Sequence, residues 1–277
     1  MEKKCPAEQA RAMVLALLRW CQAVEITVIR RVGTDREQPL DRPHRVESVA
    51  DLDRLLPWLR AENVTKNGQI FVRPDPSQPH PWLFLDDLPV RRALALAEKY
   101  ASLVIETSVG NTQVRLQANR SLTTEERSSV QRELARLIGG DGGSVAGDKW
   151  GRMAGFTNRK PARRCQWTNL LTDSTTASAR FDPTPYLQAD LHPHGDDLRV
   201  GGACPSPDGE DGSAREFAFA CHRLLDGLDP GEVIRLVADH SLRRGKRRTW
   251  REAEKYAART VSAALAALRS LHWLTPD

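Results

Sequence analysis

Two adjacent aspartates, Asp86 and Asp87, follow a run of apolar residues in the stretch PWLFLDDL (81–88). A third aspartate, Asp141, lies in the glycine-rich sequence GGDGGSVAGDKWGR. Carboxylate oxygens are the hard ligands that Mg²⁺ prefers, and this ion keeps several of its waters. Two such ions clamp the attacking and leaving oxygens in phosphoryl or nucleotidyl transfer. These residue types therefore indicate a metal site where a strand meets the edge of a sheet.

Strand geometry sets a condition on this site. Successive side chains of a regular strand point to opposite faces, so Asp86 and Asp87 can share an ion only if the strand ends or bulges there. A structural role is the alternative, because Asp87, shortly before Pro89, is also a good N-cap for a helix that follows. Asp148 competes with Asp141 as the third ligand, since glycines leave the geometry of their loop open.

A basic segment with two glycines, GRMAGFTNRKPARR (151–164), offers a second kind of chemistry. Guanidinium groups and backbone N–H groups of such a loop can grip a triphosphate or a template backbone. A solvated basic turn is the alternative. The residues that would make these contacts are Arg152, Thr157, Asn158, Arg159 and Lys160.

A third cluster lies near the end of the chain, in LRRGKRRTWR (242–251). Phosphate contacts from such a patch give salt-sensitive binding without reading sequence, so we expect it to contact DNA. We expect Trp250 beside it to lie in the core. The basic residues of this patch are Arg243, Arg244, Lys246, Arg247 and Arg248.

Composition agrees with a folded protein that binds a polyanion. The chain has 277 residues, of which 40% are apolar and 28% charged, so it can form a sizeable core. Its net charge of +5 suits nucleic acid or nucleotides. No apolar stretch has the roughly 18–20 residues needed to span a bilayer. The five cysteines are scattered without a C-x-x-C pair, which favours a reducing cytoplasm over a disulfide framework or zinc ribbon.

Hydrophobic periodicity predicts the elements that position these residues. Strands are expected at 23–33, 69–74, 82–87, 102–107 and 112–118, and helices at the start of the chain and at 48–63, 90–100 and 121–139. The second and third strands look like one hairpin and the last two like another. This order predicts an α+β fold in which helices cover one face of an antiparallel-rich sheet and the other face stays open.

The composition changes after this region. Residues 173–214 are rich in Asp, Gly, Pro and Ser, and three amphipathic helical patterns with capping residues follow. We therefore expect a domain at 1–172, a linker or irregular connection at 173–212, and a helical bundle at 213–277.

Four stretches resemble one known family in order and spacing. GRMAGFTNRK is similar to the GRLAGFTNRK-type signature of RepB-like plasmid primases, minimal members of the archaeo-eukaryotic primase superfamily. IFVRP followed by WLFLDDL resembles the paired strands that end in a double aspartate, and LVIETSVGNTQVRLQA resembles an ETS-x-x-N-x-Q hairpin. EAEKYAARTVSAAL resembles the last helix of a C-terminal bundle. The resemblance spans roughly residues 20–165 and 213–268.

This resemblance implies a DNA primase with an RRM-like catalytic core and a helical accessory domain. Asp86, Asp87 and Asp141 would be the catalytic, metal-binding residues, holding Mg²⁺ or Mn²⁺, and the spacing within the family favours Asp141 over Asp148. Arg152 and the TNRK residues 157–160 would contact the incoming nucleotide or the template. Lys149 stands where relatives often carry histidine, and a lysine meets a phosphate only as a point charge.

The resulting hypothesis is primer synthesis from nucleoside triphosphates on single-stranded DNA, for plasmid or mobile-element replication. Three alternatives stay open: a non-catalytic origin-binding protein, a primase-polymerase that prefers dNTPs, and a metal-dependent nuclease. A replicative helicase or a relaxase is a candidate further partner. We expect a monomer that does not bind a membrane.

Overall fold

The computed structural model describes residues 5–30, 38–160, 166–176, 179–187, 212–243 and 249–270. Two compact units divide the chain. We call Met1–Gln131 with Gly143–Pro183 the sheet unit, and Arg132–Gly142 with Thr184–Asp277 the helical unit. Each unit is described by itself.

The first sheet of the sheet unit contains one strand that periodicity does not reveal. Its strand order is β2-β1-β3-β7, all antiparallel. The unexpected β2 contains Pro39 and Pro43, which cannot donate to a ladder, and it lies at the edge, where proline is tolerated. The strands are β1 (Val24–Arg30), β2 (Gln38–Val46), β3 (Gln69–Pro74) and β7 (Gly151–Arg152).

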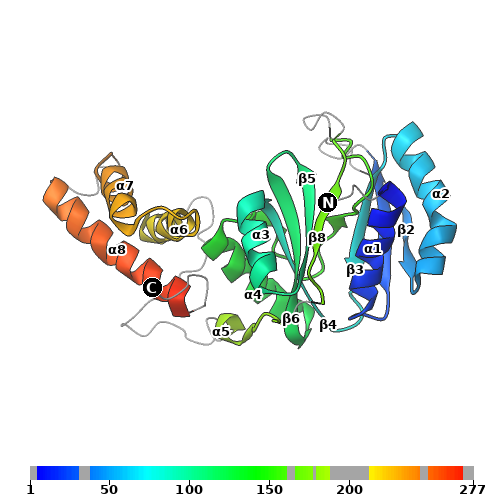
Figure 1. The fold of residues 1–277 in the computed structure, drawn as a ribbon, viewed down its shortest axis with the longest axis horizontal. Coiled ribbons are helices and arrows are strands. Elements are labelled where there is room, and N and C mark those ends of the chain that lie inside the picture. The colour runs from blue at the N-terminus through cyan, green and yellow to red at the C-terminus, as the bar shows by residue number, and fades with distance from the viewer. Residues whose placement is uncertain are drawn as a thin grey trace. The chain divides into compact units, whose positions relative to one another are not determined.

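The second sheet has the order β4-β6-β5-β8, also antiparallel. The predicted hairpin of 102–107 with 112–118 is confirmed as β5 and β6. The predicted hairpin of 69–74 with 82–87 is wrong, because β3 belongs to the first sheet and β4 to the second (Figure 1). The strands are β4 (His80–Pro89), β5 (Ser102–Ser108), β6 (Asn111–Leu122) and β8 (Asn169–Asp173).

The connection between β3 and β4 explains why these two strands do not pair. Asp75 donates its backbone N–H to the carbonyl of Ala23, and its carboxylate forms an ion pair with Arg45 of β2. Asp75 Oδ1 also accepts from the backbone N–H of Ser77 at 2.9 Å. These contacts hold the start of the connection against the first sheet, so the chain crosses to the second sheet instead of turning back.

The helices of the sheet unit are capped as their sequences predict. Ser48 Oγ accepts from the backbone N–H of Asp51 at the start of α2, which continues past Pro57. Thr123 and Glu126 form the expected reciprocal capping box of α4. The helices are α1 (Pro6–Leu18), α2 (Val49–Thr65), α3 (Val90–Lys99) and α4 (Thr124–Ile138), the last of which continues into the helical unit.

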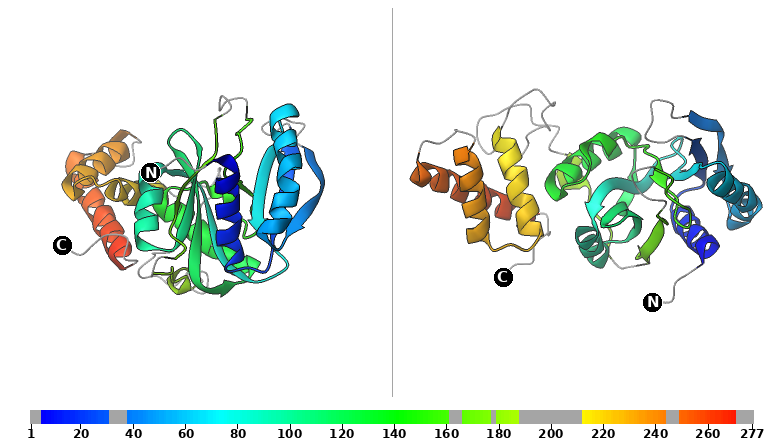
Figure 2. Two further views of the ribbon diagram at one scale, coloured as in Figure 1. Left: turned by 45° about the vertical axis from the view of Figure 1, so that its right-hand side comes forward. Right: turned by 90° about the horizontal axis from the view of Figure 1, so that it is seen from above.

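Apolar side chains from α1, α2 and both sheets form one core cluster. Helix α1 contacts β1 of the first sheet and β8 of the second, and α3 covers the second sheet (Figures 1 and 2). Trp82 of β4 is fully buried in this cluster and donates its indole N–H to the carbonyl of Leu17 in α1. The α+β class is therefore confirmed, with two four-stranded sheets in place of the single sheet that we expected.

The helical unit contains the three predicted C-terminal helices. Asp229 Oδ1 accepts from the backbone N–H of Gly231 at the start of α7, and Thr249 with Glu252 caps α8. Trp250 was expected in the core, but it is 45% exposed, so that prediction is wrong. The helices are α5 (Thr184–Leu187), α6 (Gly212–Leu225), α7 (Pro230–Arg243) and α8 (Trp250–Ser270).

Most of the predicted linker, at 188–211, lies outside the described residues, so the domain boundaries at 172 and 213 stay predictions. In the part of the chain that the structure describes, no helix is long and apolar enough to cross a membrane.

Candidate active site

Strand β4 bulges at the two aspartates. Leu85 pairs with Val114 and Leu88 with Thr112, so three residue steps on β4 match two on β6. Asp87 has a φ of 54°, in the left-handed region, and donates its backbone N–H to Asp86 Oδ1 at 2.9 Å. A bulge re-aims side chains, and non-glycine residues in this conformation cluster at functional sites. The condition that the sequence set for two neighbouring carboxylates to share an ion is therefore met.

The alternative role for Asp87, capping the next helix, is wrong. The strand continues through both aspartates to Pro89, and Pro89 itself is the N-cap of α3. Pro89 makes no side-chain capping hydrogen bond. The half-buried Asp86 and the exposed Asp87 are thus not explained by the start of the helix.

The loop that follows α4 is fastened beside β4. Gln131 Oε1 accepts from the backbone N–H of Phe84 at 2.7 Å, and its Nε2 donates to the carbonyls of Val145 and Ala146 at 3.1 Å. Ser144 Oγ consequently lies 3.5 Å from Asp86 Oδ2. The amide of Gln131 thus sets the position of a loop that is distant from β4 in sequence.

The third carboxylate is less clearly placed. Asp148 forms an ion pair with Arg73 at 3.2 Å, and Arg73 also pairs with Glu25 at 2.8 Å. Asp141 is exposed and falls within the segment that groups with the helical unit. No three His, Cys, Asp or Glu side chains of the described residues form a group that could hold a metal ion. The role of Asp141 as the third ligand therefore stays a prediction.

The Gly151–Arg152 strand, β7, joins the two sheets. It pairs with β3 in the first sheet, while the backbone N–H of Arg152 donates to Gln113 Oε1 of β6 at 2.7 Å. A Cβ atom at Gly151 would lie 2.8 Å from Arg115 Nη2 and 3.0 Å from Phe84 Cε2. An alanine at this position would have to displace the buried guanidinium of Arg115 or the ring of Phe84, so the glycine lets β7 lie close to the second sheet.

Arg115 is a buried cation beside the two aspartates. Residue type and spacing did not reveal it as a site residue. It is 3% exposed, donates from Nη2 to the carbonyls of Val72 and Lys149 at 3.0 and 3.2 Å, and lies over the ring of Phe84. Burial lowers the pKa of its guanidinium to about 9, and the negative charge of Asp86 opposes this shift. Arg115 therefore stays charged at neutral pH. The available signal was a single arginine within the otherwise uncharged predicted strand 112–118.

The TNRK residues divide into buried and accessible positions. Asn63 of α2 forms two hydrogen bonds to the backbone of Thr157. Asn63 Nδ2 donates to the carbonyl of Thr157 at 2.9 Å, and the N–H of Thr157 donates to Asn63 Oδ1 at 3.0 Å. Asn158 Nδ2 donates to the carbonyl of Thr107 at 2.7 Å, and Asn158 Oδ1 accepts from the N–H of Lys160. Thr157 and Asn158 are buried, whereas Arg159 and Lys160 are partly exposed. The buried Thr157 and Asn158 thus fix the backbone from which Arg159 and Lys160 extend.

The remaining predicted binding residues are only partly described. Lys149 is partly exposed, and its carbonyl accepts from Arg115. In the C-terminal patch, Arg243 is largely exposed and pairs with Asp239 at 2.8 Å. Arg244, Lys246, Arg247 and Arg248 lie outside the described residues, so the role of that patch stays a prediction.

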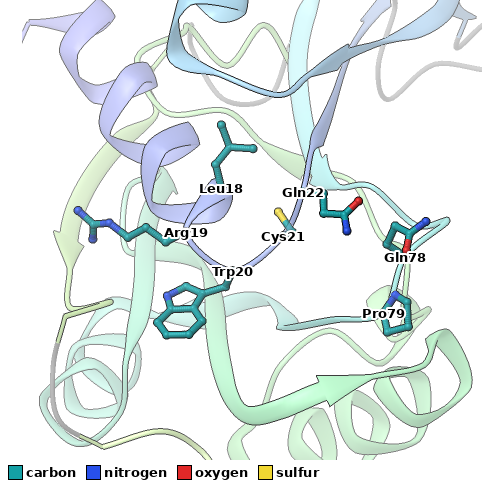
Figure 3. A pocket seen from close by; sticks show the side chains of 7 residues that line it. All are labelled: Leu18, Arg19, Trp20, Cys21, Gln22, Gln78 and Pro79. Atoms are coloured by element: carbon teal, nitrogen blue, oxygen red, sulfur yellow. The ribbon is translucent and has the colours of Figure 1, made fainter.

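A pocket of about 400 Å³ lies at the other end of β4 (Figure 3). The guanidinium of Arg180 lies 4.2 Å over the ring of Trp20, and burial raises the pKa of the Cys21 thiol to about 12. None of the side chains that line the pocket is a carboxylate, so it does not belong to the aspartate site. They are Leu18, Arg19, Trp20, Cys21, Gln22, Gln78 and Pro79.

The fold is that of a primase-type domain. Residues 27–171, just over half of the chain, match the RepB DNA-primase N-terminal domain. The chain therefore belongs to the RepB DNA-primase family, and the resemblance found in its motifs is confirmed.

Individual relatives agree with this assignment. The chain is 31% identical over 153 residues to mobilization protein A from Escherichia coli. This match covers 53% of this chain and 21% of that protein. It thus spans about a fifth of that relative's length. Two solved structures share its fold. The catalytic domain of primase RepB′ in complex with initiator DNA is 24% identical, with a TM-score of 0.55, covering 66% of this chain and 92% of that one. Primase RepB′ is 21% identical, with a TM-score of 0.56, covering 98% and 100%.

Proposed function

We propose that this chain is a DNA-dependent primase that joins nucleoside triphosphates into short primers on single-stranded DNA by metal-dependent nucleotidyl transfer. The observation that carries the proposal is the bulge of β4, which presents Asp86 and Asp87 together at a sheet edge. Membership of the RepB DNA-primase family supports it, as does the initiator DNA bound by the similar catalytic domain of RepB′.

The residues present fit Mg²⁺ or Mn²⁺. Mg²⁺ is usually bound through one or two carboxylates, with substrate phosphates and waters completing its shell. Asp86 and Asp87 supply two such carboxylates, and we propose Asp141 as a third ligand. When bound, the metal would lower the pKa of the attacking 3′-hydroxyl and neutralise charge on the transferring phosphorus.

Basic side chains of this chain would bind the triphosphate and the template. Arg152 is the proposed triphosphate contact, with Lys149 as a further point charge, and Arg159 and Lys160 are the proposed contacts to template phosphates. Gln113 fixes the backbone of Arg152, and Asn158 fixes that of Lys160, so both side chains extend from an ordered backbone. The 3′-oxygen would then attack the α-phosphorus of the second nucleotide in line, and pyrophosphate would leave.

The test is primer synthesis from labelled NTPs or dNTPs, offered separately, on a single-stranded template with Mg²⁺ or Mn²⁺. Asp86→Asn should lower the rate at least about 100-fold, because losing a metal ligand forfeits several kcal/mol of transition-state stabilisation. Asp53→Asn is the matched control, since Asp53 is a partly exposed aspartate on α2 that pairs with Arg11. It should retain activity.

Other outcomes contradict the proposal in distinct ways. No product from the parent chain, with DNA binding intact, would identify a non-catalytic DNA-binding replication protein. Degradation of the template would identify a nuclease. Extension only with dNTPs would correct the substrate and favour a primase-polymerase. Full activity in Asp86→Asn would remove the aspartate pair from the mechanism.

A further inference from the structure

An exposed tryptophan lies in the basic hairpin, our name for the paired segments 157–160 and 166–168, the first of which carries Arg159 and Lys160. Trp167 is 48% exposed and forms an isolated antiparallel bridge with Thr157. The adjacent Gln166 accepts from the backbone N–H of Val109 at 2.7 Å, and Val109, in the turn between β5 and β6, is 85% exposed. An aromatic ring and an aliphatic side chain thus lie at the surface on adjoining segments.

This surface lies at the same end of the second sheet as the aspartates. Strand β4 ends where β6 begins, with Pro89 opposite Asn111, and the turn at Val109 directly precedes Asn111. The backbone N–H of Val90, next to Pro89, donates to the carbonyl of Gly110 in that turn. The basic hairpin and the aspartate bulge therefore lie at the same end of the second sheet, next to its two opposite edge strands, β8 and β4.

The register gives the separation. Leu88 pairs with Thr112, Thr112 with Glu106, and Glu106 with Asn169, which is three strand spacings. Neighbouring strands lie about 4.8 Å apart, which gives about 14 Å across the sheet, and the two residues from Asn169 to Trp167 add about 7 Å along it, so the backbone of Trp167 lies roughly 16 Å from that of Leu88. At the 3.4 Å per nucleotide of one B-DNA strand this distance corresponds to about five stacked nucleotides, and a more extended single strand spans it with fewer.

The support of Trp167 is rigid. The backbone N–H of Asn158 donates to the carbonyl of Gln166 at 2.7 Å, and the side chain of Asn158 is bonded to Thr107. On the other side, the hydroxyl of the buried Thr168 donates to Met153 or Phe156, whose carbonyls both lie 2.7 Å away. A ring presented by a fixed backbone loses little conformational entropy when a ligand stacks on it.

Proteins that bind single strands without sequence preference combine basic side chains with exposed aromatic rings on which bases stack. We propose that Trp167 is a stacking platform for one unpaired base of single-stranded DNA, within about five nucleotides of Asp86–Asp87, and that Lys160 and Arg159 hold the adjacent phosphates. The two cations favour a polyanion over an apolar protein partner for this surface. The inference deepens the proposed function, because it assigns the path of the DNA past the same site.

The first experiment measures the affinity of the whole chain for a fluorescently labelled oligothymidylate, without nucleotides or metal. Trp167→Ala should raise Kd about 5- to 150-fold, the range found when a stacking residue is truncated to alanine, and Trp167→Phe should restore most of the affinity. The salt dependence should be unchanged in Trp167→Ala, whereas Lys160→Ala should reduce its slope by about one. Trp20→Ala, which changes a partly exposed tryptophan at the other end of β4, is the control and should bind like the parent.

A second experiment identifies the stacked base. An abasic site is moved along the oligonucleotide, and at one position it should weaken binding by the parent chain but not by Trp167→Ala. Parent-like affinity in a folded Trp167→Ala variant, or the same abasic profile in both chains, would refute the platform. Primer synthesis by the parent chain is measured separately, so a chain that makes no primers but loses affinity in Trp167→Ala contradicts the proposed function and not this inference.

Discussion

Replacing Asn63 with alanine tests how the basic hairpin is held. Asn63 lies in α2, is 2% exposed, and forms three hydrogen bonds to backbone atoms. Its Nδ2 donates to Gly68 O at 2.8 Å and to Thr157 O at 2.9 Å, and its Oδ1 accepts from the N–H of Thr157 at 3.0 Å. Two of these bonds join segments that are 94 residues apart.

The magnitude follows from those three bonds. Each contributes about 1 kcal/mol net, and a buried partner left unpaired costs about 1–3 kcal/mol. We therefore expect Asn63→Ala to reduce the free energy of unfolding of the sheet unit by about 3 kcal/mol. Asn63→Leu, which keeps the branched shape of the side chain and fills its space but forms none of the bonds, should cost a similar amount. Asn119→Ala, at an exposed asparagine of β6, should cost less than about 0.5 kcal/mol.

The assay is urea unfolding, with DNA affinity measured on the folded variants. The hairpin should also bind DNA less well in Asn63→Ala, because the backbone under Arg159 and Lys160 is less fixed. A cost below about 1 kcal/mol for both Asn63 variants, or a loss in Asn63→Ala that Asn63→Leu fully restores, would show that side-chain volume and not hydrogen bonding anchors the hairpin.

Two further predictions concern stability. His80 is 2% exposed, and burial, followed by the charges of Arg127 and Arg115, lowers its pKa from about 6.5 to about 2, so below pH 6.5 only the unfolded chain takes up the proton. The free energy of unfolding should therefore fall as the pH is lowered, and the neutral His80 accounts for a loss of about 2 kcal/mol at pH 5. His80→Gln should abolish this part of the pH dependence of the free energy of unfolding. An unaltered pH dependence would contradict the assignment to His80. Gly155 has a φ of +85°, and a Cβ there would lie 2.0 Å from Pro6 O, so Gly155→Ala should destabilise the chain by at least about 2 kcal/mol. Gly110→Ala, at a φ of +79° with open space around it, should reduce the free energy of unfolding by only about 1 kcal/mol. If thermal or urea unfolding gave equal losses for the two variants, the backbone at Pro6 would have moved to accommodate the methyl group at position 155.

Local patterns predicted elements whose signals lie within a few residues. The capping boxes at Thr123 and Thr249 are such signals, as is the alternation in β5 and β6. The sequence missed β2, because its prolines argue against a strand unless the strand is known to lie at an edge. It also paired β3 with β4, since a short connection suits a hairpin and a crossover equally well.

Candidate site residues divide in the same way. Residue type and spacing were enough to single out Asp86, Asp87 and the GRMAGFTNRK segment. Burial could not be read from them, so Asn158 looked like a ligand contact although its side chain amide bonds within the protein. Arg115 and Trp167 were missed for the same reason, because one is buried and the other exposed only through the packing of distant strands.

The sequence by itself determined the family, the α+β class, the helical termini and the pair of carboxylates, because each depends on residues that are near one another in the chain. Tertiary structure alone decided that β4 bulges at Asp87, that Arg115 lies buried beside Asp86, and that Asn63 holds the hairpin of Thr157. These features arise from contacts between segments tens of residues apart, whose free energy depends on burial and hydrogen-bond geometry that no local pattern encodes.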